Sequence, residues 1–145
     1  MSSARRQRLV MTIAGIALLA LFTWTQRDPV NATTGSPDAI AEAFRSRTSS
    51  VQVSGVGVVR RILPDDNEGS PHQRFILELS NGQTVLVSHN IDLAARLSSL
   101  DRGDTVEFFG EYEWNANGGV IHWTHHDPAR RHVGGWLKHE GRTVK

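Results

Sequence analysis

The chain has 145 residues, a length that suits one domain with an appendage, and it contains no cysteine. The lack of cysteine excludes disulfide bonds, thiolate nucleophiles and thiolate metal sites. The net charge of +1 is unevenly distributed, because residues 28–128 carry 7 Arg against 14 Asp and Glu, whereas residues 129–145 carry 5 Lys and Arg against 1 Glu. A general nucleic-acid binder would carry a basic stripe across its folded surface, so this distribution weakens that interpretation.

The first 27 residues have the pattern of a signal anchor or a signal peptide. Three arginines precede an uncharged apolar run from Leu9 to Trp24, which Arg27 closes. The run is slightly shorter than the about 20 residues that span a bilayer comfortably, and no clear small-x-small cleavage site follows it. We expect an uncleaved anchor in the inner membrane, with residues 9–24 in the bilayer and the remainder in the periplasm or outside the cell. Secretion after signal-peptide cleavage is the alternative.

Two short segments connect this anchor to the main domain. Residues 28–37 are rich in Pro, Thr and Ser and are predicted to form a linker. Residues 38–48 are predicted to form a short amphipathic helix, because Ile40, Ala43 and Phe44 would lie on one face. We expect that face to pack against the domain that follows.

From residue 51 the apolar residues recur with a period of two, which predicts strands. The expected strands cover residues 51–62, 75–79, 84–89, 104–114 and 120–125, with a helix over 92–100 between the third and the fourth. Asn81-Gly82 and Asn117-Gly118 are strong hairpin-turn signals, and Gly55 and Gly57 would let the first strand bend sharply. Three strands, a helix and two more strands are the element order of a five-stranded OB barrel. We therefore predict a mainly β fold with an OB-like barrel over residues 49–128; an open α+β sheet is the rival.

Histidine is concentrated at the C-terminal end of the chain. Five of the seven histidines lie in the last 24 residues, two of them in a basic C-terminal segment over 129–145. Imidazole titrates near neutral pH, binds transition metals and transfers protons. The candidate ligands of a divalent transition metal, grouped near the end of the last strand, are His125, His126, Asp127, His132 and His139. Their spacing matches no helical H-E-x-x-H motif, so a polar or anion-binding site and purely structural hydrogen bonding remain open.

Strand register suggests candidate catalytic and ligand-binding residues. A two-residue turn at Asn117-Gly118 would place Glu113 opposite His122, a carboxylate–imidazole pair suited to proton transfer, and would turn Trp123 into the core. A solvated ion pair is the alternative interpretation of that pair. Arg74 would face His89 across the other hairpin. The candidate ligand-binding residues are Arg74, His89, Arg130, Arg131 and Trp136.

Four strings resemble a family of small bacterial proteins of unknown function that carries an H-W-T-H signature. They are His72-Gln73-Arg74-Phe75, His89-Asn90-Ile91-Asp92-Leu93-Ala94, Gly110-Glu111-Tyr112-Glu113-Trp114-Asn115 and Gly119-Val120-Ile121-His122-Trp123-Thr124-His125-His126-Asp127-Pro128. The resemblance covers about residues 51–142. The family has no settled activity, so the resemblance implies no catalytic role for any residue.

These observations favour a membrane-anchored, extracytoplasmic OB-like binding module with a His-rich site at the end of the barrel. Its expected ligand is a polyanion, an oligosaccharide or a short nucleic acid, because OB barrels commonly bind such polymers. One alternative is a metal-dependent hydrolase of phosphate esters, in which a metal held by His and Asp activates water and Glu113 or a histidine moves the proton. Another is a structural or adaptor protein of the envelope, with histidines as hydrogen-bonding staples or as a pH sensor.

Overall fold

The structure is a computed structural model that describes residues 37–145. The predicted anchor and all but the last residue of the predicted linker lie outside these residues. Among the helical residues from Pro37 onward, none belongs to a helix long and apolar enough to cross a membrane.

The described residues form a mainly β domain. Its elements are α1 (Pro37–Ser46), β1 (Val51–Asp66), β2 (His72–Leu79), β3 (Thr84–Asn90), β4 (Thr105–Glu113), β5 (Val120–His122), β6 (Trp136–His139) and β7 (Arg142–Val144). The short helix predicted before the domain is therefore present, as are all five predicted strands.

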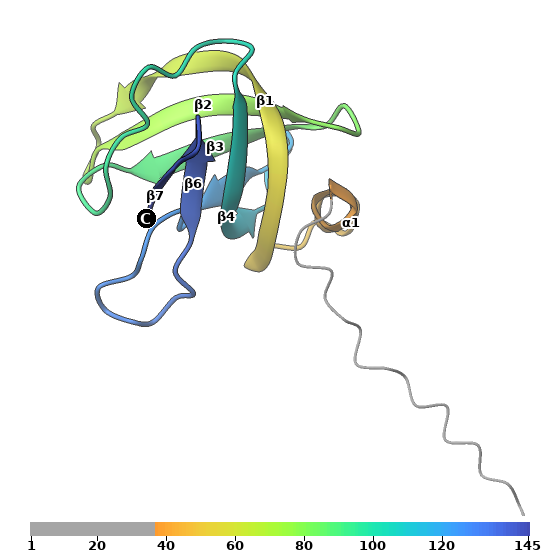
Figure 1. The fold of residues 1–145 in the computed structure, drawn as a ribbon. Coiled ribbons are helices and arrows are strands. Elements are labelled where there is room, and N and C mark those ends of the chain that lie inside the picture. Colours follow the sequence, from red (N-terminus) through yellow and green to blue (C-terminus); the bar gives the residue numbers. More distant parts are fainter. Residues whose placement is uncertain (1–36) are drawn as a thin grey trace, which may run out of the picture.

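Five of the strands close into a ring (Figure 1). Their order is β1-β2-β3-β5-β4, and a pairing between β1 and β4 joins the two ends. The long β1 serves both neighbours, since residues 51–58 pair with β4 and residues 57–66 pair with β2. Gly55 permits the close packing inside this bend, because a Cβ there would lie 2.7 Å from the ring of Phe108.

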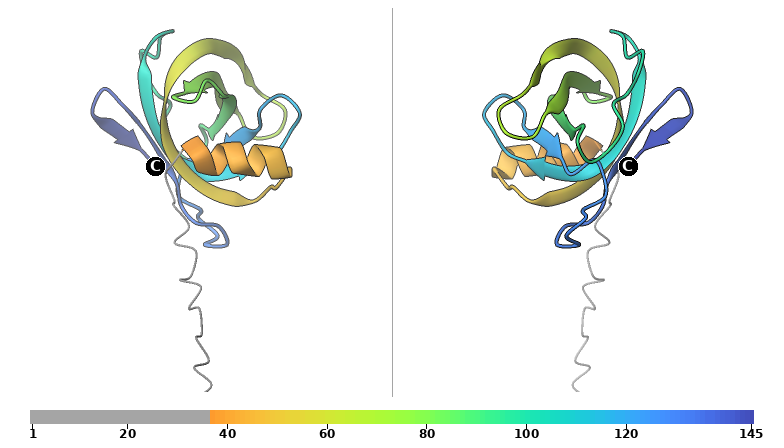
Figure 2. Two further views of the ribbon diagram at one scale, coloured as in Figure 1. Left: turned by 90° about the vertical axis from the view of Figure 1, so that its right-hand side faces the viewer. Right: turned by 90° about the vertical axis from the view of Figure 1, so that its left-hand side faces the viewer.

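The core fills the ring, and α1 covers one of its ends. Alternate residues of the strands point inward, and Phe75, Phe108 and Tyr112 are among the largest fully buried side chains. Figure 2 looks along the ring and shows α1 lying across an open end. Ile40 and Ala43 of this helix belong to the buried core, as the amphipathic pattern predicts.

The predicted helix over 92–100 is wrong, because residues 91–104 form turns and irregular backbone instead. Buried side chains form hydrogen bonds with backbone N–H and C=O groups that would bond to each other in a helix. Gln73 donates to the Leu97 carbonyl (3.0 Å) and accepts from the Leu97 N–H (2.9 Å), while His89 bonds the Ala95 carbonyl (3.0 Å). Tertiary hydrogen bonds thus hold an irregular segment despite its helical apolar spacing.

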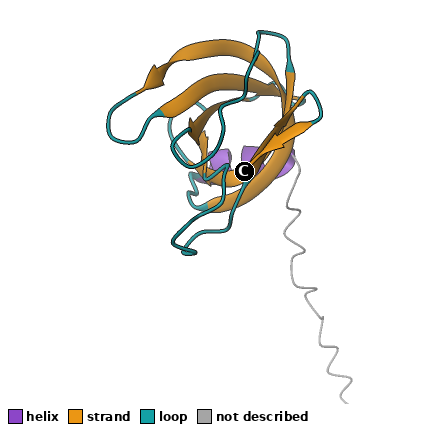
Figure 3. Ribbon diagram, turned by 60° about the vertical axis from the view of Figure 1, so that its left-hand side comes forward, coloured by secondary structure: helices purple, strands orange, loops and turns teal. Residues whose placement is uncertain are grey.

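The C-terminal segment adds two strands that the sequence pattern did not predict. Strand β6 pairs with the first half of β4, and β7 pairs with β6. Leu137 of this hairpin is fully buried. Figure 3 shows the long β3–β4 and β5–β6 loops outside the strands; the second loop begins where the predicted fifth strand was expected to continue.

Both predicted hairpin registers are wrong. The β4–β5 turn is longer than two residues, since Asn115 Oδ1 accepts from the N–H groups of Asn117 (2.8 Å) and Gly119 (3.1 Å). His122 therefore faces Glu111 instead of Glu113, a shift of two residues that leaves the side chains of β5 on their predicted faces.

The β2–β3 register differs by one residue, which exchanges the two faces. The turn between these strands holds three residues instead of two, because the Leu79 N–H donates to the Gln83 carbonyl (2.8 Å). His89 faces Gln73 and points into the core, while Arg74 faces Ser88 and points outward.

Candidate functional site: a cleft lined by histidines

A cleft opens where the backbone pairing of the ring stops. Strands β3 and β5 run parallel and pair only at Leu86–Val120 and Val87–Ile121. The outward-facing residues beyond that point surround a cleft of about 180 Å³. The residues that line this histidine cleft are His72, Ser88, Asn90, Leu93, His122, Trp123 and His125.

On the inner side of the strands, where the β3–β5 backbone pairing has stopped, His89 forms side-chain hydrogen bonds to two other segments. Its ring is fully buried; Nε2 lies 3.0 Å from the Ala95 carbonyl and Nδ1 lies 2.8 Å from the Thr124 hydroxyl. A carbonyl oxygen only accepts, so Nε2 carries the proton and Nδ1 accepts from the Thr124 hydroxyl. Burial lowers the pKa of His89 to about 4, so the ring is neutral at pH 7. Both nitrogens are engaged within the protein, which gives this predicted ligand-binding residue a structural position.

His122 is the central imidazole of the cleft. It points outward from β5 and is half-buried. Burial lowers the pKa of His122 and the nearby His72 lowers it further, while Glu113 acts in the opposite direction. The ring is therefore uncharged at neutral pH and can both donate and accept a hydrogen bond.

Glu113, the predicted catalytic partner of His122, is engaged elsewhere. Its Oε1 accepts from the N–H (3.2 Å) and the hydroxyl (3.1 Å) of Ser50. Burial acts to raise the pKa of Glu113, but the hydrogen bonds from Ser49 and Ser50 lower it overall. Burial raises the pKa of the adjacent Glu111, and the hydrogen bond with Glu113 raises it further. Glu113 is thus ionised, and its carboxylate holds Ser50 at the start of β1.

Trp123 lies beside the cleft instead of in the core, which corrects the prediction from register. The inward position opposite Tyr112 belongs to Ile121. Trp123 has a φ of +52°, and its ring stacks on His132 with centroids 3.8 Å apart and planes 14° apart. His125 contacts Trp123 at 5.5 Å between ring centroids and donates from Nδ1 to the His126 carbonyl (2.7 Å).

The five predicted metal ligands do not gather at one point. His139 is buried at the far end of β6, where Nε2 lies 2.9 Å from Asp104 Oδ2. The Asp127 carboxylate accepts three backbone N–H groups of its own loop, and His126 is exposed. Over residues 37–145, no group of three or more His, Asp or Glu side chains has the arrangement of a metal site. The transition-metal cofactor stays a prediction.

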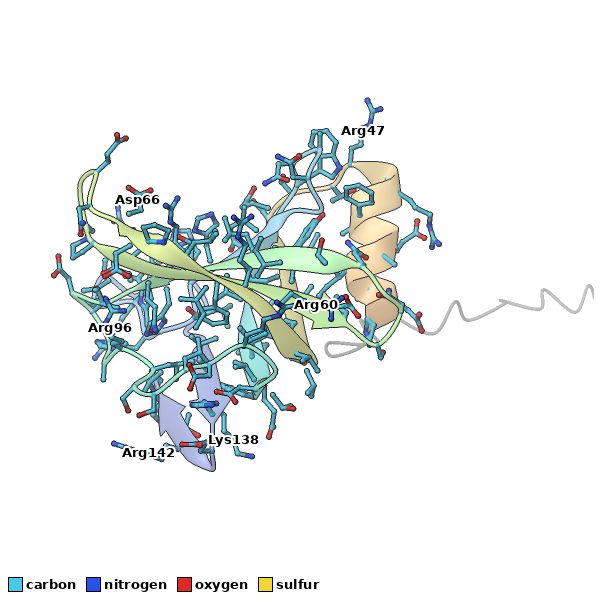
Figure 4. All side chains as sticks on the ribbon, turned by 90° about the horizontal axis from the view of Figure 1, so that it is seen from above. Arg47, Arg60, Asp66, Arg96, Lys138 and Arg142 are labelled. Carbon is cyan, nitrogen blue, oxygen red and sulfur yellow. The ribbon has the colours of Figure 1, made fainter. Side chains whose placement is uncertain are left out.

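The remaining predicted ligand-binding residues lie outside the cleft lining. Arg74 donates from Nε to the Pro64 carbonyl (3.0 Å), Trp136 packs near Phe109 (6.4 Å between centroids), and Arg130 and Arg131 are exposed. Other charged side chains form ion pairs outside the cleft lining, and Figure 4 labels the basic member of three of these pairs. These pairs are Arg60–Glu78, Arg96–Asp65 and Lys138–Glu107.

The sequence interpretation missed three polar lining residues, namely His72, Ser88 and Asn90. His72 pairs with Asn90 across β2 and β3. All three occupy alternate, outward positions near the paired strand ends, so a correct hairpin register would have placed them together.

These features define a mainly β domain in which five strands close around one core and a polar cleft opens between two of them. The chain belongs to the family described as "Protein of unknown function (DUF3465)", which matches residues 24–145. The match confirms the predicted membership of an uncharacterised family and extends beyond the predicted 51–142. No curated protein and no solved structure showed a significant match.

Proposed function

We propose that this chain is a membrane-anchored, extracytoplasmic OB-like binding module that takes an oligosaccharide in the histidine cleft. The ring order β1-β2-β3-β5-β4 is the strand order of an OB barrel, and OB barrels bind oligosaccharides and oligonucleotides on the face of their second and third strands. The cleft draws His72, Ser88 and Asn90 from that face. The anchoring part of the proposal rests on the apolar run at residues 9–24.

The choice of an oligosaccharide as the ligand rests on the residues that line the cleft. Its lining offers imidazole, hydroxyl and amide groups together with Trp123, and none of these side chains carries a permanent charge. Sugar hydroxyls need donors and acceptors of this kind, and the C–H face of a sugar ring can pack on an indole. A polyanion or a nucleic acid would need Lys or Arg along the groove. The lining therefore supports an uncharged, hydroxyl-rich ligand over the two anionic classes.

Calorimetric titration of the full-length chain tests this proposal. The probes are uncharged hexasaccharides of different linkage (maltohexaose, cellohexaose and chitohexaose), with heparin and a thymidine oligonucleotide as anionic comparisons. We expect at least one hexasaccharide to bind with little dependence on salt. His122→Ala should weaken that binding about tenfold, because a hydrogen bond to a buried polar group is lost.

His126→Ala is the matched control, since it removes an exposed imidazole from the neighbouring loop and should leave binding unchanged. Circular dichroism of both variants verifies that the fold is retained. Strongly salt-dependent binding of heparin or the oligonucleotide alone, or saccharide binding that is insensitive to His122→Ala, would contradict the proposal.

A further inference from the structure

The later part of the β5–β6 connection presents a second surface, and none of its residues lines the histidine cleft. Its residues Pro128–Gly134, here called the arginine loop, are all exposed and lie beyond the strands in Figure 1. The loop carries Arg130, Arg131 and Val133, and Val133 (57 % exposed) is the most exposed large apolar side chain of the described residues. One short exposed segment thus combines two arginines with an apolar side chain.

The loop is held in a defined conformation. The Asp127 carboxylate accepts from the N–H groups of Ala129 (2.9 Å), Arg131 (2.7 Å) and His132 (3.0 Å). The Gly135 N–H donates to the His125 carbonyl (2.9 Å), which closes the base of the loop. His132 stacks on Trp123 and leaves the two arginines and Val133 at the exposed side. A preorganised surface loses less entropy when it binds a partner.

The two guanidinium groups of the loop are unpaired in the part of the chain that the structure describes. Within residues 37–145, neither Arg130 nor Arg131 forms an ion pair, and Asp127 spends its carboxylate on backbone groups. Residues 37–128 carry 7 Arg against 13 Asp and Glu, whereas residues 129–145 carry 5 Lys and Arg against 1 Glu. An extended anion that wrapped the domain would meet this negative body, but a flat anionic surface can meet the loop alone.

We propose that the arginine loop docks the domain onto an anionic phospholipid surface. Guanidinium groups bind phosphate oxygens in a bidentate manner, and an apolar side chain next to them can enter the headgroup–acyl boundary. The predicted apolar run ends at Trp24, and the 12 residues from Thr25 to Ser36 can reach about 40 Å when extended. A membrane entered by the predicted anchor would therefore keep the start of the domain within about 40 Å of its surface.

Because the chain has no cysteine, a single Ala129→Cys substitution in the full-length chain gives a unique site for a polarity-sensitive fluorophore. The labelled chain is incorporated into phosphatidylcholine vesicles, with or without about one-third phosphatidylglycerol. We expect a blue-shifted emission in the anionic vesicles that high salt reverses. A label at Ser80→Cys, in the exposed β2–β3 turn, should report no difference between the two lipids.

Charge-removing variants identify the residues responsible. Arg130→Gln with Arg131→Gln should lower the ratio of docked to undocked chain about 30-fold, since each cation near an anionic surface contributes about fivefold. Arg61→Gln with Arg102→Gln, two exposed arginines elsewhere, is the matched control and should change little. Val133→Ser should reduce the blue shift, and Val133→Leu should retain it.

Equal emission in both lipids, or docking that survives the Arg130/Arg131 double variant, would overturn the proposal. So would a blue shift produced by heparin or a thymidine oligonucleotide in neutral vesicles, because the partner would then be a soluble polyanion. Loss of saccharide binding in His122→Ala tests the cleft separately, so the two proposals fail independently.

Discussion

At the scale of single residues, the buried His89 shows how the fold uses a histidine without exposing it. Its Nε2–H donates to Ala95 and its Nδ1 accepts from Thr124, so the neutral ring joins β3 to two other segments. Protonation would turn Nδ1 into a donor facing a hydroxyl and would place a charge in the core. The low pKa of about 4 for His89 follows from this burial.

His89 should make the stability of the protein depend on pH. Below pH 6.5 the imidazole of His89 binds a proton in the unfolded chain, whereas in the folded state it binds one only below about pH 4. The free energy of unfolding should therefore fall by about 3 kcal/mol between these limits through His89 alone. His89→Gln can retain a donor and an acceptor but cannot titrate, so its fall from pH 7 to pH 4 should be smaller by about this amount.

Urea denaturation at several pH values measures the difference. His126→Gln removes an exposed imidazole and should keep the pH dependence of the unmodified chain. The interpretation would be wrong if His89→Gln showed the same fall in stability as the unmodified protein.

The roles of individual histidines could be predicted only where they do not depend on register. The sequence pattern identified His122 as an outward residue, and the two-residue shift of β5 preserved this because it is even. The one-residue shift of β3 turned His89 from a predicted surface ligand into a core residue. A three-residue turn and a two-residue turn share the Asn81-Gly82 signal, so the sequence could not distinguish them.

At the scale of elements, the β5–β6 loop shows how one carboxylate can order a connection that has no strand or helix of its own. Asp127 accepts three backbone N–H groups that would otherwise need water. Arg130 adopts a φ of +54°, a conformation that a non-glycine residue keeps only when its surroundings hold it.

Asp127→Ala should therefore loosen this loop while leaving the ring of strands folded. The amide hydrogens of Ala129, Arg131 and His132 should exchange with solvent about tenfold faster or more, because each loses its acceptor. Hydrogen exchange followed by NMR measures these rates, with the amides of β2 as an internal reference. Unchanged exchange at all three amides would show that Asp127 does not hold the loop.

Local sequence patterns predicted most helices and strands, but they failed where contacts with residues distant in the sequence determine the backbone structure. The alternation in β1 to β5 and the amphipathic face of α1 are local, and both were predicted. The irregular segment after β3 depends on Gln73, which lies 24 residues from Leu97 in the chain. The β6–β7 hairpin has too few residues for a periodic pattern, and its pairing with β4 is a tertiary contact.

At the scale of the whole molecule, β4 ties the ring and the C-terminal hairpin into one unit. One edge of β4 pairs with β1, while β5 and β6 divide its other edge. Phe108 of β4 lies opposite Leu137 of β6, and both side chains are fully buried. The basic, histidine-containing segment over 129–145, which the sequence pattern places outside the predicted barrel, thus contributes to the core. Its hairpin also fixes one end of the arginine loop.

Leu137→Ala should consequently destabilise the entire domain instead of releasing the hairpin alone. Loss of a fully buried leucine costs about 2–5 kcal/mol in a core that cannot collapse around the cavity. The exposed Val133→Ala, four residues away, should change the free energy of unfolding by less than about 0.5 kcal/mol. Denaturation followed by circular dichroism and by tryptophan fluorescence should give coincident transitions in both variants. The fluorescence reports on both parts, because Trp114 packs against the core beside the end of β4 and Trp136 lies in the hairpin. An early, separate transition of the fluorescence in Leu137→Ala would mean that the hairpin unfolds independently of the ring. The histidine cleft would then not depend on the segment that supports the arginine loop.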